Sequence, residues 1–424
     1  MVGAGALCQA AALLLAGADA IRVLVSGVPL TLEVPLGSLV ISGGFALDAL
    51  AAVFVLALVI VGLARAVYTP AYLARADHRM APGTQQALLS LLQASMLGVL
   101  VATDVIGFFL PWEIMTAIAT ALVLADGHHP EVKRAAILYI VINHIGTLAA
   151  LAGLLILSDG GSLSFDALRN GAADRSDLSY GLGVALTLVG FGTKAGVVPL
   201  HVWLPEAHPA APSQVSALLS GVILKIGVYA MLRSALDLAG PPAAWIGYLL
   251  LTVGLASALL GVLYALMQHD LKRLLAFHSV ENIGIILLGV GLGVGAQQAG
   301  MPALGALALA AGLFHVINHA VFKALLFLCA GSIHLGAHTH DLEEMGGLIR
   351  PMPSTARAFL IGALAISALP PLNGFASEWL ILEGFIGAKD ATSEFLRAAA
   401  PLLAAGLALT GALAAACFVK AFAV

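Results

Sequence analysis

The chain has 424 residues, of which 61% are hydrophobic and only 10% are charged, and its mean hydropathy is +1.02. A soluble globular domain is about 45–50% apolar, so this composition indicates an integral membrane protein built almost entirely in the bilayer. The formal net charge of −4 leaves no basic surface for nucleic acid, which excludes that class of partner.

About twelve segments are long and apolar enough to cross a bilayer, which takes about 20 residues of helix. The first run has no basic segment before it and no clear cleavage site, so we interpret it as a retained helix rather than a signal peptide. Residues 28–39 contain two prolines and are expected to form an extended loop or a hairpin, and a short interfacial helix is expected near 165–168. The expected spans are 3–25, 45–68, 83–103, 104–124, 134–157, 179–200, 213–235, 243–267, 272–294, 303–332, 355–387 and 394–422.

The basic residues predict the orientation, because cytoplasmic loops carry an excess of lysine and arginine. If the segments alternate, ten basic residues fall on one side and six on the other. We therefore expect a multi-pass protein of the inner (plasma) membrane, with both termini of this chain in the cytoplasm. The larger group is Arg65, Arg75, Arg79, Lys133, Arg134, Lys272, Arg273, Arg350, Arg357 and Lys420, and the smaller is Arg22, Arg169, Arg175, Arg233, Lys389 and Arg397.

Two segments contain helix-breaking residues at membrane depth, one at Gly192–Pro199 and one at Leu369–Gly374. Irregular backbone inside a membrane is tolerated where protein buries it or water reaches it, and a pair of interrupted helices indicates an inverted-repeat transporter. We therefore predict a single all-α transmembrane domain, 1–424, with N-terminal helices and loop in 1–82. A first repeat would occupy 83–237 and a second 243–422, each of five helices with one broken helix.

Several charged residues interrupt these apolar segments, although a charge at the bilayer centre costs at least about 2.5–3.5 kcal/mol. Such residues usually face a polar interior and mark an ion or proton path. Glu113 follows Pro111-Trp112, and Lys194, just before the first break, is its natural counter-ion. The alternative is a structural ion pair that fixes helix packing. Lys225 lies in the next helix, where the alternative is a lysine that extends to the membrane surface.

His315, His319 and Lys323 are spaced i, i+4, i+8, so all three lie on one helix face. Each step rises about 6 Å, which is too long for a direct proton transfer but suits a bridging water. Two histidines at this spacing also suit zinc, but no carboxylate ligand accompanies them and Lys323 would repel a metal ion.

Glu378 follows the second break and is the expected terminal proton site, with a solvated position near the membrane surface as the alternative. A further group of polar residues either extends the path or only bonds between helices: His144, His201, His208, Lys272 and His278.

No cofactor is expected in this chain. The three cysteines, Cys8, Cys329 and Cys417, are far apart, so an iron–sulfur cluster or a structural zinc site is not expected. No Walker A motif and no GxGxxG motif after a strand is present, so no nucleotide site is expected. Redox chemistry or ATP hydrolysis coupled to this chain would occur on another subunit.

The sequence resembles the antiporter-like, proton-conducting subunits of respiratory complex I, membrane-bound hydrogenases and multisubunit Na⁺/H⁺ antiporters. The resemblance covers nearly the whole chain after residue 39. Within the family, the segments 278–284 and 341–347 are most similar to the branch that holds the B-type subunit of hydrogenase-4 and the formate hydrogenlyase membrane subunit. The motifs that carry the family resemblance are Pro111-Trp-Glu113, Thr193-Lys-Ala-Gly196, Pro199–His208, Asp270–Ser279, His315…His319…Lys323 and Leu369–Phe375.

The resemblance implies two five-helix inverted repeats, each holding half of a proton channel. It implies that Glu113 pairs with Lys194 and that Lys225 relays protons. It further implies that His315, His319, Lys323 and Glu378 form the second half. Only one helix precedes the loop at 28–39, where the family has two, and the chain stops inside an apolar helix at Val424. We therefore expect a short form, a split gene product or a fragment.

The leading hypothesis is a non-redox subunit that translocates protons while partner subunits of a membrane-bound oxidoreductase transfer electrons. Displacement of the Glu113–Lys194 pair would drive a proton along Lys225 toward Lys323 and Glu378. The expected partners are the bilayer, other membrane and peripheral subunits, and protons, with Na⁺ as the alternative ion. The rival functions are a subunit of a Na⁺/H⁺ antiporter without a redox partner, a proton-conducting partner of a soluble enzyme, and a non-functional fragment.

Overall fold

The structure, a computed structural model, describes residues 2–33, 44–76, 80–127 and 129–423. The described chain divides into two compact units. Unit 1 comprises Met1–Ala195 and Ala210–Pro242, and unit 2 comprises Gly196–Pro209 and Ala243–Val424. Each unit is described by itself.

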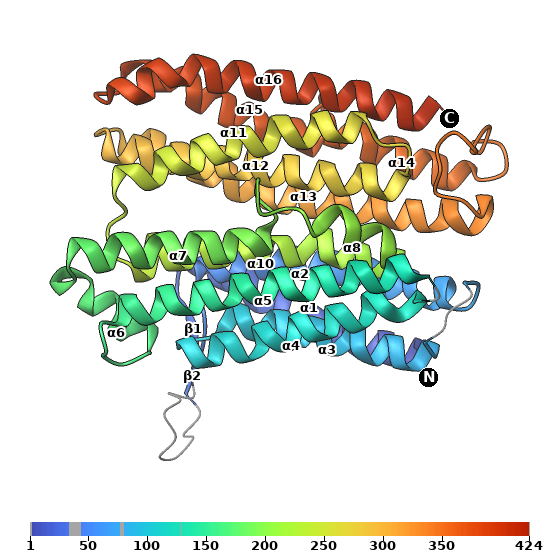
Figure 1. The fold of residues 1–424 in the computed structure, drawn as a ribbon, viewed down its shortest axis with the longest axis horizontal. Coiled ribbons are helices and arrows are strands. Elements are labelled where there is room, and N and C mark those ends of the chain that lie inside the picture. Colours follow the sequence, from blue (N-terminus) through green and yellow to red (C-terminus); the bar gives the residue numbers. More distant parts are fainter. Residues whose placement is uncertain (1, 34–43, 77–79, 128, 424) are drawn as a thin grey trace. The chain divides into compact units, whose positions relative to one another are not determined.

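Unit 1 is a bundle of helices with one short β-hairpin (Figure 1). Its last membrane helix is continuous but changes its winding twice, with π-helical turns at Leu219–Ile223 (η3) and Arg233–Leu238 (η4). The remaining elements are α1 (Val2–Ser26), β1 (Leu30–Glu33), β2 (Gly44–Leu47), α2 (Ala49–Leu73), α3 (Pro82–Val101), α4 (Val105–Val123), η1 (Leu124–Asp126), α5 (Pro130–Ser158), α6 (Phe165–Asn170), η2 (Gly171–Asp174), α7 (Asp177–Ala195), α9 (Ser213–Leu218) and α10 (Leu224–Leu232).

In the described residues of unit 2, all the regular elements are helices, joined by loops. They are α8 (Leu204–Ala210), α11 (Ala244–Leu266), α12 (Leu271–Gln298), α13 (Pro302–Ala337), α14 (Pro353–Ile366), α15 (Asn373–Gly387), η5 (Ala388–Asp390) and α16 (Glu394–Ala423). An apolar core that includes Leu251, Ile285, Leu292, Ile381 and Phe385 holds α11, α12, α15 and α16 together.

Aspartates begin three of the long helices in the way that helix capping predicts. The carboxylates of Asp48, Asp104 and Asp270 accept hydrogen bonds from the backbone N–H three residues later, at 2.9, 2.7 and 2.7 Å. Each bond satisfies one of the otherwise unpaired donors in the first helical turn, which contributes about 1 kcal/mol. The three aspartates therefore set where α2, α4 and α12 start.

Small residues bring neighbouring helices close together. A Cβ atom on Gly190 of α7 would lie 2.4 Å from the carbonyl oxygen of Gly146 in α5, and one on Gly284 of α12 would lie 2.5 Å from the backbone nitrogen of Ala258 in α11. In lipid, where helix association depends on van der Waals contact, such close approach is the usual source of packing energy.

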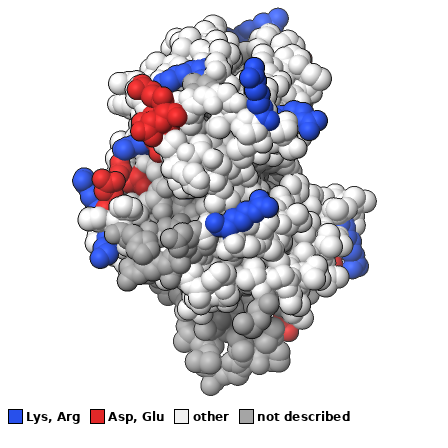
Figure 2. Space-filling view, turned by 90° about the vertical axis from the view of Figure 1, so that its right-hand side faces the viewer, with Lys and Arg blue, Asp and Glu red and all other residues white. Residues whose placement is uncertain are grey.

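The prediction of an all-α, multi-pass membrane fold is confirmed. Ten helices of the described residues are long and apolar enough to span a membrane, against about twelve predicted. The other two predicted spans, 179–200 and 355–387, are the interrupted ones. Figure 2 looks onto the ends of the helices and shows acidic and basic side chains in small groups among uncharged residues. The division into repeats 83–237 and 243–422 stays a prediction.

Both predicted breaks are present. Helix α7 ends at Ala195, Gly196 has a φ of +76°, and regular α-helix resumes only at Leu204. Helix α14 ends at Ile366 and α15 begins at Asn373. A Cβ atom on Gly374 would lie 1.9 Å from the carbonyl oxygen of Ala365, so only glycine fits where the two half-helices approach.

The predicted loop and interfacial helix are also found. Strands β1 and β2 pair antiparallel with Leu30 opposite Leu47, and α6 (Phe165–Asn170) covers the expected short helix. Residues 34–39 of the predicted loop lie outside the described residues, as does Arg79, one of the basic residues used to predict the orientation.

Arg65 corrects the predicted distribution of basic residues, because it lies inside α2 and is 0% exposed rather than in a loop. Its guanidinium donates to Thr69 and Gln86 at 3.3 and 3.4 Å, and also contacts Gln9 and Gln93. The predicted span ended at residue 68, which placed Arg65 near a helix end, whereas α2 continues to Leu73. The buried amides of α1 and α3 accept hydrogen bonds from the guanidinium there.

Candidate functional site

Lys194 lies in the last turn of α7 with only 1% of its surface exposed. Its ammonium donates to the hydroxyl of Thr116 in α4 at 2.8 Å and to the hydroxyl of Tyr139 in α5 at 3.4 Å. It also lies 5.5 Å from the ring centre of Trp112 and 5.1 Å from that of Tyr139, in the range of cation–π contacts. The charge is therefore held by neutral groups from two neighbouring helices.

Glu113 does not pair directly with Lys194, which differs from the pairing that the family resemblance implied. Its carboxylate contacts His144 Nδ1 of α5 at 3.0 Å, with 34% of the glutamate and 57% of the histidine side chain exposed. Trp112 and Thr116, four residues apart, share the α4 face toward Lys194, whereas Glu113 is turned about 100° away. Its charge still acts on Lys194 and Tyr139 through space.

Lys225 is 1% exposed in α10 and donates to the carbonyl of Ser220, which the preceding π-helical turn displaces from the regular helical pattern. The alternative of a lysine reaching the membrane surface is excluded by this burial. Helices α10 and α7 touch nearby, because a Cβ atom on Gly227 would lie 2.5 Å from the backbone nitrogen of Ala195. Both buried lysines of unit 1 thus lie on helices in direct contact.

Unit 2 buries a lysine together with a carboxylate and a histidine. Lys323 of α13 is 0% exposed, donates to the carbonyl of Leu275, and lies 5.7 Å from the ring centre of Phe327. On α12, one turn after Leu275, His278 Nδ1 contacts the carboxylate of Glu281, and both side chains are at most 1% exposed. The charge of Glu281 acts on Lys323. Lys323, His278 and Glu281 therefore form a sealed cluster, that is, a cluster of three titratable groups buried from the surface.

Polar side chains continue from this cluster to the second helix break. His315 contacts the Asn282 Oδ1 at 3.1 Å and the Ser377 hydroxyl at 2.9 Å, which joins α12, α13 and α15. Asn318 donates to the same hydroxyl at 2.9 Å and to the carbonyl of Asn373 at 2.8 Å. At the second break, the first residues of α15 therefore accept hydrogen bonds from side chains of α13.

Glu378 lies one residue after Ser377 and is only 8% exposed, which rules out the alternative of a solvated surface residue. Its carboxylate is within electrostatic reach of Glu281. It lines a pocket of about 260 Å³ between α14, α15 and α16 together with Leu369, Trp379 and Gly411. Glu378 thus lies between the buried cluster and a hollow in unit 2.

The remaining predicted residues lie in several places. The rings of His315 and His319 face each other at 6.4 Å on one side of α13, as their spacing predicts. The His208 ring is buried against Phe327 at 5.4 Å, and the His201 ring lies 6.4 Å from that of Phe277. Lys272 is 3% exposed at the start of α12. Among the described residues, no three His, Cys, Asp or Glu side chains are grouped as a metal site requires.

Glu281 is the main residue whose role the sequence did not reveal. The sequence analysis did not single it out, yet it forms the carboxylate centre of unit 2. The available signal was a histidine and a glutamate at i, i+3 inside an apolar segment, since such a pair lies on one helix face. Thr116 and Tyr139 carried no signal, because single hydroxyl groups are common in membrane helices.

Comparison with known proteins identifies the family. Residues 102–400 match the model described as NADH:quinone oxidoreductase/Mrp antiporter, TM. The chain is 43% identical over 383 residues to hydrogenase-4 component B of Escherichia coli (strain K12), covering 89% of this chain and 56% of that protein. It is 40% identical over 338 residues to formate hydrogenlyase subunit 3 of the same strain, covering 79% and 54%.

A solved structure agrees with these sequence matches. A chain of the Mrp complex from Dietzia sp. DQ12-45-1b superposes with a TM-score of 0.84 at 27% identity, over 99% of this chain and 74% of that one. The chain spans about half the length of the curated relatives it matches. The resemblance inferred from the motifs, including the hydrogenase-4 and formate hydrogenlyase branch, is confirmed. This multi-pass membrane chain belongs to the NADH:quinone oxidoreductase/Mrp antiporter transmembrane family.

Proposed function

We propose that the chain is a proton-translocating, antiporter-like membrane subunit of a redox-driven complex of the hydrogenase-4, formate hydrogenlyase or NADH:quinone oxidoreductase kind. The observation that carries the proposal is the sealed cluster of Lys323, Glu281 and His278 in unit 2. Titratable groups inside a membrane are expensive to bury, and they are usually retained where protons or ions move. The relatives at 40–43% identity support the kind of complex.

In unit 2, the buried groups form a sequence along which a proton moves. Lys323 holds it as an ammonium opposite the Glu281 carboxylate, and His278 touches the same carboxylate. His315, bridged to Asn282 and Ser377, continues toward Glu378 and its pocket. Each transfer leaves one group neutral and charges the next, and bridging waters span the gaps that side chains do not close.

In unit 1, the state of Glu113 controls Lys194. A carboxylate at Glu113 favours the charged ammonium of Lys194, which otherwise has only neutral partners. Protonated His144 neutralises that carboxylate and weakens its hold on the lysine. Because both members of the Glu113–His144 pair are partly exposed, an event at the edge of unit 1 acts on the buried lysine. Lys194 and Lys225 lie on touching helices, so the released proton passes between them.

The test measures proton transport and electron transfer together in inverted membrane vesicles that contain the complete complex. Formate, H₂ or NADH is supplied as the electron donor, and acidification of the vesicle interior is followed. We expect Lys323→Ala to abolish acidification, whereas Lys389→Ala, which removes an exposed lysine just after α15, leaves it unchanged. Wild-type acidification by Lys323→Ala would refute the proposal.

Exchange of Na⁺ for H⁺ is the second candidate, favoured by the likeness to a chain of an Mrp complex. It predicts that adding Na⁺ to vesicles with a preset pH gradient dissipates the gradient without any electron donor. The redox-driven proposal predicts no such dissipation.

We also propose that the complex lies in the plasma membrane with the termini of this chain in the cytoplasm. The basic residues Arg273, Arg350 and Arg357, all outside or at the ends of helices, support this orientation. A reporter inserted at Gly346 is then expected to be active in the cytoplasm, and one inserted at Gly160 is expected outside. The reverse pattern would invert the topology.

A further inference from the structure

The helix that carries Lys225 is polar along one face although most of its length is buried. The span Ser213–Leu238 is 100% buried over its apolar window. From Lys225, a polar side chain follows at every fourth position: Tyr229, Arg233 and Asp237. This i+4 spacing places them on one face, with a rise of about 6 Å per step. The face begins at Lys225, whose ammonium bonds back to the carbonyl of Ser220, and runs to the end of the helix. A bridging water is therefore needed between the ammonium and Tyr229.

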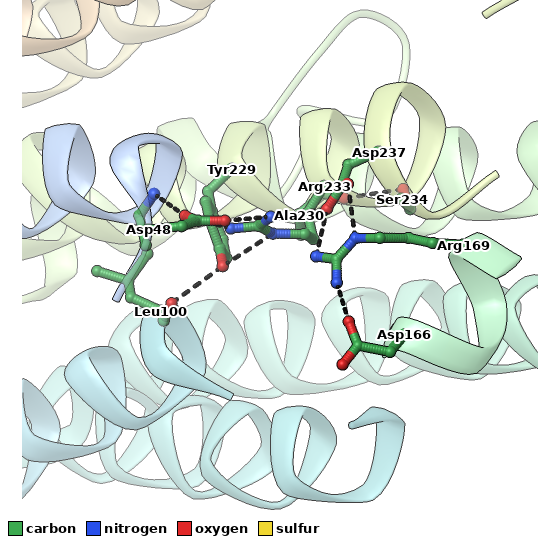
Figure 3. Close-up of polar contacts among 10 residues, drawn as sticks. Asp48, Leu100, Asp166, Arg169, Tyr229, Ala230, Arg233, Ser234 and Asp237 are labelled. Atoms are coloured by element: carbon green, nitrogen blue, oxygen red, sulfur yellow. Dashed lines mark hydrogen bonds and ion pairs between the residues drawn. The ribbon is translucent and has the colours of Figure 1, made fainter. Parts of the chain in front are cut away.

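Hydrogen bonds connect this face to the surface of unit 1. The Tyr229 hydroxyl accepts from Arg233 Nε at 3.2 Å and donates to the carbonyl of Leu100 at 3.0 Å. Arg233 also donates to Asp48 and Asp237, each at 2.7 Å. Figure 3 shows these side chains in a row between the start of α2 and the end of α3.

The last residue of this row is exposed to solvent. Arg169 of α6 donates to Asp237 at 2.8 Å and to Asp166 at 2.7 Å, and the Asp166 side chain is 86% exposed. Asp48, Asp166, Arg169 and Arg233 line a pocket of about 630 Å³, which we call the vestibule, together with the β-hairpin and Thr103. A water molecule occupies about 30 Å³ in the liquid, so the vestibule has room for many.

Two observations favour a conducting role over a purely structural ion network. A buried ion network is a weak source of stability, because removing its charges from water costs about as much as their attraction returns. The helix also changes to π-helical winding on both sides of Lys225 and Tyr229, and such turns occur frequently at functional sites.

Asp48 lies outside the membrane helices, at the water-connected end of the row. Burial raises the pKa of its carboxyl, but the hydrogen bond and charge of Arg233 outweigh burial and hold that pKa below its ordinary value. Asp48 therefore releases a proton readily to water.

We propose that unit 1 contains its own water-connected proton branch, from Lys225 through Tyr229 to Asp48 and the vestibule. The branch rests on the proposed function and adds these residues to it. In one passage, the Lys225 ammonium gives a proton to a bridging water and becomes a neutral amine. The Tyr229 hydroxyl takes that proton, turns from the Leu100 carbonyl and passes its own proton through a second bridging water to the Asp48 carboxylate, and the carboxyl then releases it to vestibule water. Arg233 is a positioning residue that orients both Tyr229 and Asp48.

The test uses the complete complex in inverted vesicles, with protons moved per electron as the readout. Tyr229→Phe keeps the ring and its packing against Phe54, and Asp48→Asn keeps a residue that caps α2. We expect each variant to slow proton transfer through the branch about 100-fold, the lower end for loss of a proton-relaying group, and thereby to lower the proton-to-electron ratio. The matched controls, Tyr180→Phe and Asp174→Asn, change partly or fully exposed residues and are expected to behave as wild type.

A second measurement tests the vestibule without reference to transport. In a variant whose three cysteines are replaced, Thr103→Cys is expected to react with a membrane-impermeant thiol reagent, whereas Val141→Cys, on an exposed apolar helix face, is not. Protection of Thr103→Cys would overturn the branch. So would wild-type ratios in Tyr229→Phe and Asp48→Asn alongside losses in Lys194→Ala and Lys323→Ala, a result that leaves the proposed function intact. Absence of transport in the wild-type complex would refute both.

Discussion

The two units bury a lysine in different ways. In unit 1, the ammonium of Lys194 contacts hydroxyl groups and aromatic rings, and the carboxylate that acts on it, Glu113, is 34% exposed and bound to His144. In unit 2, Lys323, Glu281 and His278 are all sealed at 0–1% exposure. The carboxylate that acts on the buried lysine is therefore partly exposed in unit 1 and fully buried in unit 2. We infer that proton transfer in unit 1 is controlled at the Glu113–His144 pair, whereas proton transfer in unit 2 takes place within a buried cluster.

The strongest way to break this comparison is to neutralise the two carboxylates in turn. Glu281→Gln leaves the Lys323 ammonium buried without its counter-charge, and we expect it to destabilise the complex by about 3 kcal/mol. Glu113→Gln is expected to lose less, because that carboxylate makes no direct contact with Lys194 and its partner His144 is itself partly exposed. Thermal unfolding of the purified complex in detergent measures both. Glu394→Gln, at an exposed helix start, is the control. Equal losses from the two substitutions would show that the sites are not different in kind.

Removing the hydroxyl that holds Lys194 tests the neutral character of the unit 1 site. Thr116→Val deletes the acceptor at 2.8 Å while preserving side-chain shape. A hydrogen bond to a charged group contributes about 1.5–3 kcal/mol, so we expect a loss of about 2 kcal/mol and a slower rate of proton transport. Thr120→Val, one turn further along α4, removes a hydroxyl that bonds only to the backbone carbonyl of Thr116. Identical behaviour of the two variants would argue that Thr116 does not bind the lysine.

His340, in the loop that follows α13, is expected to make the stability of unit 2 depend on pH. The His340 ring stacks on His334 at 3.9 Å, and burial, with the nearby charges of Lys272 and His334, lowers the pKa of His340 to about 2. The folded state therefore keeps this ring neutral, while the unfolded chain binds a proton below pH of about 6.5. Stability is lost as pH falls below that value, by about 1 kcal/mol at pH 5.5.

His340→Gln is expected to remove that part of the pH dependence. The measurement is the unfolding midpoint at pH 7.5 and 5.5 for wild type and variant. An unchanged difference between the two pH values would mean that His340 does not carry the effect.

The smallest expected effect comes from the exposed partner of Glu113. His144→Gln keeps a polar group near the carboxylate, and we expect only a small change in stability. Proton transport is nevertheless expected to slow part of the way toward the rate of Glu113→Gln, because the contact that orients the Glu113 carboxylate is lost. A transport rate identical to that of wild type would remove His144 from the control of Lys194.

The sequence predicted those features of the fold that depend on residues close together in the chain. Membrane-length apolar runs, the glycine and proline breaks and the spacing of His315 and His319 each depend on neighbouring residues, and each has its counterpart in the structure. The count of spans differed because an interrupted helix reads as a single apolar run.

The contacts of the site depended on helix rotation, which no short pattern encodes. Glu113 and Thr116 are three residues apart, and only the packing of α4 against α5 and α7 decides which of them meets Lys194. Glu281 was missed for the same reason, since its importance lies in its position opposite Lys323 on another helix. Asp48 and Arg233 are 185 positions apart, beyond the reach of any spacing argument.

The central claim is that Lys194 and Lys323 both conduct protons. The most direct test measures protons translocated per electron in Lys194→Met, Lys323→Met and the double variant, with electron transfer recorded in the same vesicles. Methionine fills the space of the lysine stem without a charge. The account predicts that each single substitution lowers the ratio as far as the double one does, because each site is required. A wild-type ratio in either single variant would contradict it, since that lysine would then be structural.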